Sequence, residues 1–214
     1  HGAFSPLCRG WKEIVCFSIS AGMSTSGNVM RLAAEELGAS DRIKVIDSAN
    51  LSTGIGLLVV EAAIMAKNNR TASQIVSEIE KLKPNVRASF VVDTLTYLYR
   101  GGRCNAVAAM AGGVLKLHPR IVVEDGAMNA SKKYRGKIAS VVMNYVKDME
   151  KDLKKARPER VFITHSGCEQ ETVEKVRAYL KELDIFDEIL ETRAGGVVSS
   201  HCGPGTLGVL YIAK

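Results

Sequence analysis

Hydroxyl side chains gather in residues 18–27, which read Ser-Ile-Ser-Ala-Gly-Met-Ser-Thr-Ser-Gly. The apolar run before them predicts a strand, and the serines then lead into the start of a helix. The first N–H groups of a helix lack partners within it and carry partial positive charge, so they can bind an anion. Ser20 and Ser24 could add hydroxyl donors to such a site. Composition alone favours the simpler interpretation, in which Ser24 caps the helix.

A histidine precedes a sharp turn in residues 199–205 (SSHCGPG), because Gly-Pro-Gly fixes the chain there. An imidazole held at such a turn can donate to a carboxylate or shuttle a proton. A structural histidine is an equally good interpretation of His201. A serine hydrolase using Ser24 and His201 is the catalytic alternative. Against it, the sequence has no Gly-x-Ser-x-Gly elbow and no obvious carboxylate that orients His201.

Basic residues are concentrated between positions 94 and 137. This stretch contains eight basic and two acidic residues, so its excess of positive charge equals the net charge of the whole chain, +6. Gly101-Gly102 permits an unusual turn, and the arginine after it could meet a phosphate or a carboxylate. A structural ion pair is an equally good interpretation of this arginine. The patch favours an anionic partner, such as a nucleotide or an acidic protein face, over nucleic acid, because no aromatic residues interleave it. The candidate contacts are Arg103, Lys132, Lys133 and Arg135.

Strands and helices alternate in the first part of the chain. We predict strands at residues 13–20 and 43–46, and helices at residues 24–37, at residues 52–67 and from residue 71 to Pro84. Alternation of this kind predicts a parallel sheet with helices on both faces.

The later part has a different pattern, which places a domain boundary near residues 84–87. Asp125-Gly126 between two apolar runs is a hairpin signal, and a hairpin within an α/β pattern predicts a mixed sheet. We predict helical stretches at residues 95–99, 105–117, 137–157 and 169–183, and further strands at residues 88–93, 160–164, 186–191 and 208–212.

The composition, with 46% hydrophobic and 24% charged residues, is that of an ordinary globular protein. No apolar run reaches the roughly 18 residues that a membrane span requires, and the first residues do not read as a secretory signal. The five cysteines are odd in number and lack metal-ligand spacing, which argues against a disulfide framework or a zinc site. We therefore expect a cytoplasmic protein without metal or cofactor.

Five segments in this order resemble the DegV family. They are SIS-GMS at residues 18–24, DS…STGIGLLVVEAA at 47–63, VVDTLTYLYRGGR at 91–103, PRI…EDGAM…KKYRGK at 119–137 and SSHCGPGTLGV at 199–209. The resemblance covers nearly the whole chain. Its most specific parts are the DTL-YL-GGR and H-GPG segments.

The resemblance implies an α/β fold of two DegV domains, at residues 1–86 and 87–214. The first domain would be a three-layer α/β/α parallel sheet, apparently without its N-terminal part, and the second an α/β domain with a mixed sheet. It also implies a long-chain fatty acid in a tunnel between the domains. Its carboxylate would be held by Ser24, Ser20 and His201, and its acyl chain lined by residues 52–66 and 105–115.

The same resemblance implies a carrier rather than an enzyme. The loaded protein would present its fatty acid to an ATP-dependent fatty acid kinase, which makes the acyl phosphate used in phospholipid metabolism. We expect the kinase or its nucleotide to contact the basic residues named above. Two alternatives remain at this point: the serine hydrolase with Ser24 and His201, and a regulatory module without a ligand.

Overall fold

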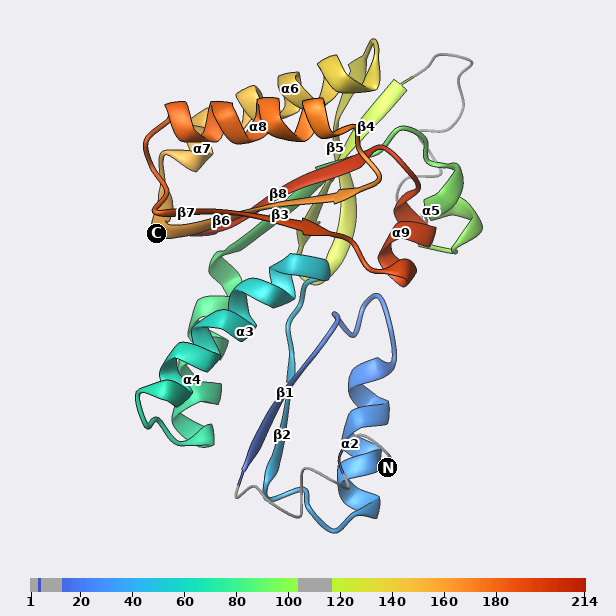
Figure 1. Cartoon of the computed structure of the whole chain (residues 1–214). Coiled ribbons are helices and arrows are strands. Elements are labelled where there is room, and N and C mark those ends of the chain that lie inside the picture. Colours follow the sequence, from blue (N-terminus) through green and yellow to red (C-terminus); the bar gives the residue numbers. More distant parts are fainter. Residues whose placement is uncertain (1–3, 5–12, 104–116) are drawn as a thin grey trace. The chain divides into compact units, whose positions relative to one another are not determined.

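The computed structural model describes residue 4, residues 13–103 and residues 117–214. Contacts within the chain divide it into two compact units, shown in Figure 1. The first unit contains the residues up to Pro84 together with Asp125–Ala127, and the second contains Asn85–Glu124 and Met128–Lys214. The assignment of residues 1–86 and 87–214 to separate domains stays a prediction.

The first unit is built around two parallel strands, β1 (Ile14–Ser18) and β2 (Ile43–Asp47). Helix α2 (Ser26–Glu36) lies on one side of the pair, and α3 (Ser52–Lys67) and α4 (Ala72–Leu82) lie on the other (Figure 1). The parallel pairing and the layered arrangement confirm the predicted α/β class. A 3₁₀ turn, η1 (Lys83–Asn85), follows α4.

Local sequence explains where these helices start. Thr71 and Gln74 form a reciprocal capping box at the start of α4. By contrast, the prediction that Ser24 caps α2 is wrong, because the N-cap is Thr25 and no side chain caps this helix. At α3, a Cβ atom on Gly54 would lie only 2.0 Å from Oδ1 of Asn50, so glycine is what lets the buried Asn50 pack against the first turn.

The second unit contains a six-stranded mixed sheet with the order β5-β4-β3-β8-β6-β7. Strands β6 and β7 pair in parallel, while β3–β4, β3–β8 and β6–β8 are antiparallel. The mixed sheet is therefore confirmed. The strands are β3 (Val86–Val91), β4 (Leu117–Glu124), β5 (Ala127–Arg135), β6 (Ala156–Ser166), β7 (Glu188–Arg193) and β8 (Thr206–Ala213).

Three helices, α6 (Ile138–Asp148), α7 (Glu150–Leu153) and α8 (Gln170–Glu182), lie along one face of this sheet (Figure 1). Fully buried side chains from these helices and from alternate positions of β6 and β8 form the core between them. The prediction of one helix over residues 137–157 is wrong at its end, because β6 already begins at Ala156. Pro158 disfavours helical dihedrals at the residue before it, which favours an extended chain there.

The hairpin predicted at Asp125-Gly126 is confirmed by β4 and β5. Asp125 and Gly126 have φ angles of 50° and 75°, the left-handed conformation that a tight two-residue hairpin turn requires. The helix predicted at residues 105–117 lies outside the described residues except at Leu117, which begins β4.

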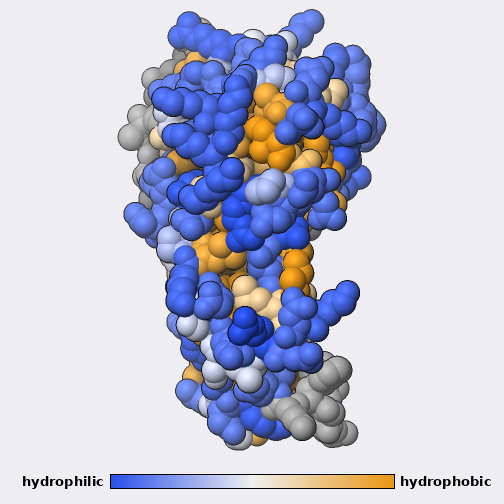
Figure 2. All heavy atoms as spheres, turned by 90° about the vertical axis from the view of Figure 1, so that its left-hand side faces the viewer, coloured by the Kyte–Doolittle hydropathy of each residue, from blue (hydrophilic) through white to orange (hydrophobic). Residues whose placement is uncertain are grey.

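The described surface carries several well-exposed hydrophobic side chains. Figure 2 shows one face, on which hydrophobic residues gather in patches framed by hydrophilic ones. The exposed large hydrophobic side chains among the described residues are Val29 and Leu32 on α2, Val59 and Ile64 on α3, Tyr99 and Val197. In the described part of the chain, no helix is both long and apolar enough to cross a membrane.

Candidate functional site

Ser20 lies in the loop between β1 and α2, and its hydroxyl is fully used within the fold. The residue is 2% exposed, and its hydroxyl donates to the carbonyl of Gly126 at 2.6 Å. The same oxygen accepts the N–H of Gly22 at 3.1 Å. This bonding favours a structural role for Ser20 over the predicted role as a carboxylate ligand.

Ser24 differs from Ser20 in exposure and in bonding. It is partly buried beside the first turn of α2, where its hydroxyl oxygen lies 2.8 Å from that of Ser26 and accepts the Ser26 N–H at 3.2 Å. Two hydroxyls therefore stand together at a helix start that has no acidic residue in its first turn. The bond between them uses one hydroxyl hydrogen and leaves the other for an anion to accept, and Ser26 is a member that sequence reasoning missed.

Asp47 fixes the loop that carries these serines. Its two carboxylate oxygens accept the N–H groups of Ala21, at 3.2 Å, and Ala49, at 2.9 Å. The ends of β1 and β2 are neighbours because Ser18 pairs with Asp47 in the sheet register. A carboxylate directly after a predicted strand was the available signal for this role.

In the second unit the structure brings together the two most specific sequence segments. His201 lies on the short helix α9 (Gly196–Cys202), which packs against α5 (Thr96–Arg100). A Cβ atom on Gly101 would lie 2.0 Å from Nδ1 of His201, and one on Gly203 would lie 2.2 Å from the ring of Tyr97. These two glycines permit α5 and α9 to approach closely.

The imidazole of His201 has a buried nitrogen, Nδ1, at the contact between α5 and α9. Its Nδ1 is buried against Gly101 and has no hydrogen-bond partner among the residues that the structure describes. A serine hydrolase needs a carboxylate that orients its histidine, and none bonds to Nδ1 here within that same set of residues. The geometry thus disfavours the hydrolase alternative and leaves Nε2 as the ring nitrogen suited to meeting a ligand.

The thiols near this helix are not activated nucleophiles. Burial raises the pKa of Cys202 to about 11. Burial, together with the charge of Glu169, raises the pKa of Cys168 to about 11 as well. Both thiols are therefore protonated near neutral pH and act as packing groups.

The basic candidates on β5 divide between the two sides of this edge strand. Lys132 donates to Asp148 at 2.6 Å and lies 5.2 Å from the ring centroid of Tyr134. Lys133 and Arg135 are exposed, at alternate positions, and neither has an ion-pair partner in the described part of the chain. Lys133 and Arg135 are thus the better placed of the three to meet an outside anion.

Arg103 lies just after α5, where its guanidinium donates to the carbonyl of Gly101 at 2.7 Å. It remains exposed, close in sequence to the backbone against which His201 packs. Of the predicted acyl-chain lining, residues 105–115 lie outside the described residues. The other predicted lining segment, residues 52–66, lies within α3.

A hollow of about 320 Å³ follows the outer edge of β2, between α2 and α4, and none of the predicted site residues lines it. Among residues 13–103 and 117–214, no group of three or more histidine, cysteine or acidic side chains could hold a metal ion. Of the predicted carboxylate ligands, Ser20 and Ser24 therefore lie near the start of α2, and His201 lies at the contact between α5 and α9.

Comparison with known proteins decides the family. The model of the family described as "Uncharacterised protein, DegV family" matches residues 3–214. The chain belongs to the DegV family. A DegV domain-containing protein of Deinococcus radiodurans is 32% identical over 208 residues, which cover 97% of this chain and 72% of that protein. The DegV protein of Bacillus subtilis is 25% identical over 215 residues, which cover 99% of this chain and 74% of that protein.

Solved DegV structures share the fold. A DegV family protein from Thermus thermophilus, described for its fatty acid binding, matches with a TM-score of 0.89 and 25% identity, over 100% of this chain and 75% of that one. DegV of Bacillus subtilis, described as a fatty acid binding protein, matches with a TM-score of 0.81 and 26% identity, over 100% and 75% of the two chains. The Fak B3 protein of Streptococcus pneumoniae, loaded with linoleic acid, has a TM-score of 0.84 and 20% identity, over 100% and 74%, and shows the shared fold alone.

Proposed function

We propose that this protein binds a long-chain fatty acid and holds its carboxylate with Ser24 and His201. The observation that carries the proposal is membership of the DegV family, in which two solved relatives at 25–26% identity are described for fatty acid binding. The tunnel between two domains, which the resemblance implies, stays a prediction.

The two polar places described above suit a carboxylate. The paired hydroxyls of Ser24 and Ser26 stand at a helix start, where partial positive charge favours an anion. The Nδ1 side of His201 faces Gly101, which leaves Nε2 as a donor to a carboxylate oxygen. Burial of an acyl chain would add about 0.8 kcal/mol per methylene, so a few polar groups suffice to set its direction.

Mass spectrometry tests this proposal directly. An organic extract of the purified protein should contain one long-chain fatty acid per chain, and the native mass of the intact protein should exceed the sequence mass by the same ligand. Folded protein that purifies empty, and that binds no added palmitate in titration calorimetry, contradicts the proposal.

The finer part of the proposal is that the loaded protein presents its fatty acid to an ATP-dependent fatty acid kinase. The exposed side chains of Lys133 and Arg135 on β5, with Arg103 after α5, offer positive charge to the kinase or its nucleotide. Lys132 contributes less, because Asp148 already neutralises it.

Charge reversal distinguishes a role in the kinase contact from a role in fatty acid binding. The double variant K133E/R135E should slow formation of acyl phosphate in an assay with a bacterial fatty acid kinase and ATP, while palmitate binding stays unchanged. The control K175E/K181E reverses the same number of charges on α8 and should leave the rate as it is. Equal rates for the two double variants would remove Lys133 and Arg135 from the kinase contact.

A further inference from the structure

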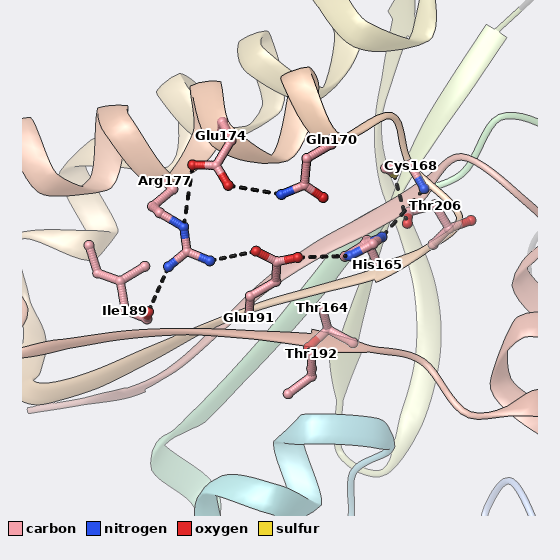
Figure 3. Close-up of polar contacts among 10 residues, drawn as sticks. All are labelled: Thr164, His165, Cys168, Gln170, Glu174, Arg177, Ile189, Glu191, Thr192 and Thr206. Atoms are coloured by element: carbon pink, nitrogen blue, oxygen red, sulfur yellow. Dashed lines mark hydrogen bonds and ion pairs between the residues drawn. The ribbon is translucent and has the colours of Figure 1, made fainter.

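A polar network at the ends of β6 and β7 has no part in the function proposed so far. Figure 3 shows Arg177 of α8 pointing to Glu191 of β7, Glu191 pointing to His165 of β6, and His165 approaching Cys168 in the following loop. His165 is 8% exposed. A buried imidazole with a charged partner calls for an explanation beyond packing.

The sheet register places these side chains on one face. Ile163 pairs with Glu191 and His165 pairs with Arg193, so His165 and Glu191 are diagonal neighbours on the face that α8 covers. Nε2 of His165 lies 3.4 Å from Oε1 of Glu191. The other oxygen, Oε2, accepts a hydrogen bond from Arg177 at 2.5 Å, and Arg177 also donates to the carbonyl of Ile189 at 2.9 Å.

One hydrogen bond indicates which tautomer the neutral imidazole adopts. The backbone N–H of Cys168 donates to Nδ1 of His165 at 3.4 Å, so Nδ1 must carry a lone pair. The ring proton of the neutral form is then on Nε2, where it faces Glu191. The network thus connects the guanidinium of Arg177 to the backbone of the loop after β6 in one defined arrangement.

The end of β6 and the loop after it hold the helix of His201 at both ends. Before α9, the N–H of Ala194 donates to the carbonyl of His165 at 2.9 Å. After α9, the N–H of Gly205 donates to the carbonyl of Ser166 at 2.8 Å, and the thiol of Cys168 donates to the carbonyl of Thr206 at 3.4 Å. The last two residues of β6, 165 and 166, together with Cys168 of the following loop, therefore hold both flanks of α9.

Two side-chain hydrogen bonds also hold α9 itself. The hydroxyl of Thr206 donates to the carbonyl of Cys202 at 3.0 Å, and the hydroxyl of Ser199 donates to the carbonyl of Ala194 at 3.0 Å. His201 lies between these two bonds. Because α9 is only seven residues long, these bonds at its two flanks help to fix the position of His201.

We propose that His165, set by Glu191 and Arg177, is a positioning residue that aims His201 at the carboxylate of the ligand. The inference rests on the proposed function, since it assigns His201 to the carboxylate. His165 acts through the loop and α9 and does not touch the ligand.

The test compares a charged and an uncharged ligand of equal length, palmitate and hexadecanol, on the full chain. A correctly oriented His201 favours palmitate over hexadecanol. Because the two ligands have chains of equal length, the ratio of their affinities reports on the head group alone. We expect His165→Ala to lower this ratio about tenfold, the size of one lost hydrogen bond to a charged group. His165→Asn should restore most of it, because the amide oxygen can take the place of Nδ1.

Glu191→Gln should lower the ratio in the same direction while the fold stays intact. Its matched control is Glu188→Gln, which removes a carboxylate 3.5 Å from Arg160 at the opposite end of the same two strands. The Cε1–H resonance of His201 in the NMR spectrum of the ligand-free protein should shift in Glu191→Gln and not in Glu188→Gln. A purely structural role for the network would lower stability without changing the affinity ratio.

The two proposals fail in different ways. If His201→Ala lowers the palmitate-to-hexadecanol ratio while His165→Ala and Glu191→Gln leave it at the wild-type value, the positioning role is overturned and the binding function stands. If the wild type does not bind palmitate, or if His201→Ala leaves the ratio unchanged, the assignment of His201 fails and the positioning role fails with it.

Discussion

The loop before α2 and the contact between α5 and α9 each bury a polar side-chain atom, but the two atoms differ in their hydrogen bonding. In the first, the hydroxyl of Ser20 is buried and bonds to Gly126 and Gly22. In the second, Nδ1 of His201 is buried beside Gly101 with no hydrogen bond from the described residues. Native proteins satisfy most buried polar atoms, so an unsatisfied one is more informative about function than a satisfied one. The sequence alone does not show which of the two buried atoms has a hydrogen-bond partner.

The largest expected effect comes from Gly101→Ala. A methyl group at this position would lie 2.0 Å from His201, so the ring and α9 must shift. We expect a loss of about 3 kcal/mol in the free energy of unfolding, typical of overpacking, together with weaker palmitate binding. Urea unfolding and calorimetry would measure the two effects.

Gly102→Ala is the control for this change. Apart from its chain neighbours, no described residue has an atom within 4 Å of a Cβ at Gly102. Its φ of +68° is left-handed, so we expect a cost of about 1 kcal/mol from strain alone. Combining Gly101→Ala with His201→Ala should recover stability, because the clashing ring is gone. Equal costs for the two glycine variants would show that His201 does not lie against Gly101.

Ser20→Ala and Ser24→Ala test the difference within the first unit. Loss of the Ser20 hydroxyl leaves the N–H of Gly22 and the carbonyl of Gly126 without their partner, which should cost about 2 kcal/mol of stability. The cost for Ser24 should be smaller, about 1 kcal/mol, with palmitate affinity reduced about tenfold. If palmitate affinity depends on Ser20 more than on Ser24, the distinction between structural and ligand-binding hydroxyls is wrong.

The smallest effect concerns β5. Burial would raise the pKa of Asp148, but hydrogen bonds from Lys132 and Tyr134 outweigh it and lower the pKa below its ordinary value. A lowered carboxyl pKa stabilises the fold above the unfolded-state pKa, and this stabilisation is lost as the pH falls through the folded-state pKa. Lys132→Ala should therefore cost about 0.5 kcal/mol at neutral pH and less below about pH 4.

Urea midpoints measured at neutral and acidic pH would show this convergence. Lys133→Ala is the matched control, because Lys133 has no acidic partner among the described residues, and its small effect should not depend on pH. A pH-dependent effect of Lys133→Ala would contradict this difference between Lys132, which pairs with Asp148, and Lys133, which does not.

Sequence reasoning predicted the class and most of the elements, because apolar periodicity and turn residues act locally. Asp125-Gly126 specified its hairpin, and Thr71 with Gln74 specified the start of α4. The end of the helix predicted at residues 137–157 was missed, because the apolar spacing continues through Met149 and Leu153, which stay buried after α6 ends.

The candidate site was predictable only in part. The glycines of the GGR and H-GPG segments suggested turns, but their shared purpose, to let His201 and Tyr97 pack against the opposite backbone, needs the two segments side by side. The bonds of Ser20 were also hidden, because its partner Gly126 is 106 residues away. Long-range hydrogen bonds leave no periodic signal in a sequence.

The place of β8 has a consequence for biosynthesis. It lies between β3 and β6 in the sheet, yet it comes after both of them, and after β7, along the chain. Until residues 206–213 have left the ribosome, the segments β3–β4–β5 and β6–β7 have no strand to join them, and each presents an unpaired edge. A chain that emerges from its N-terminus therefore has to keep two half-sheets apart from other nascent chains until β8 joins them.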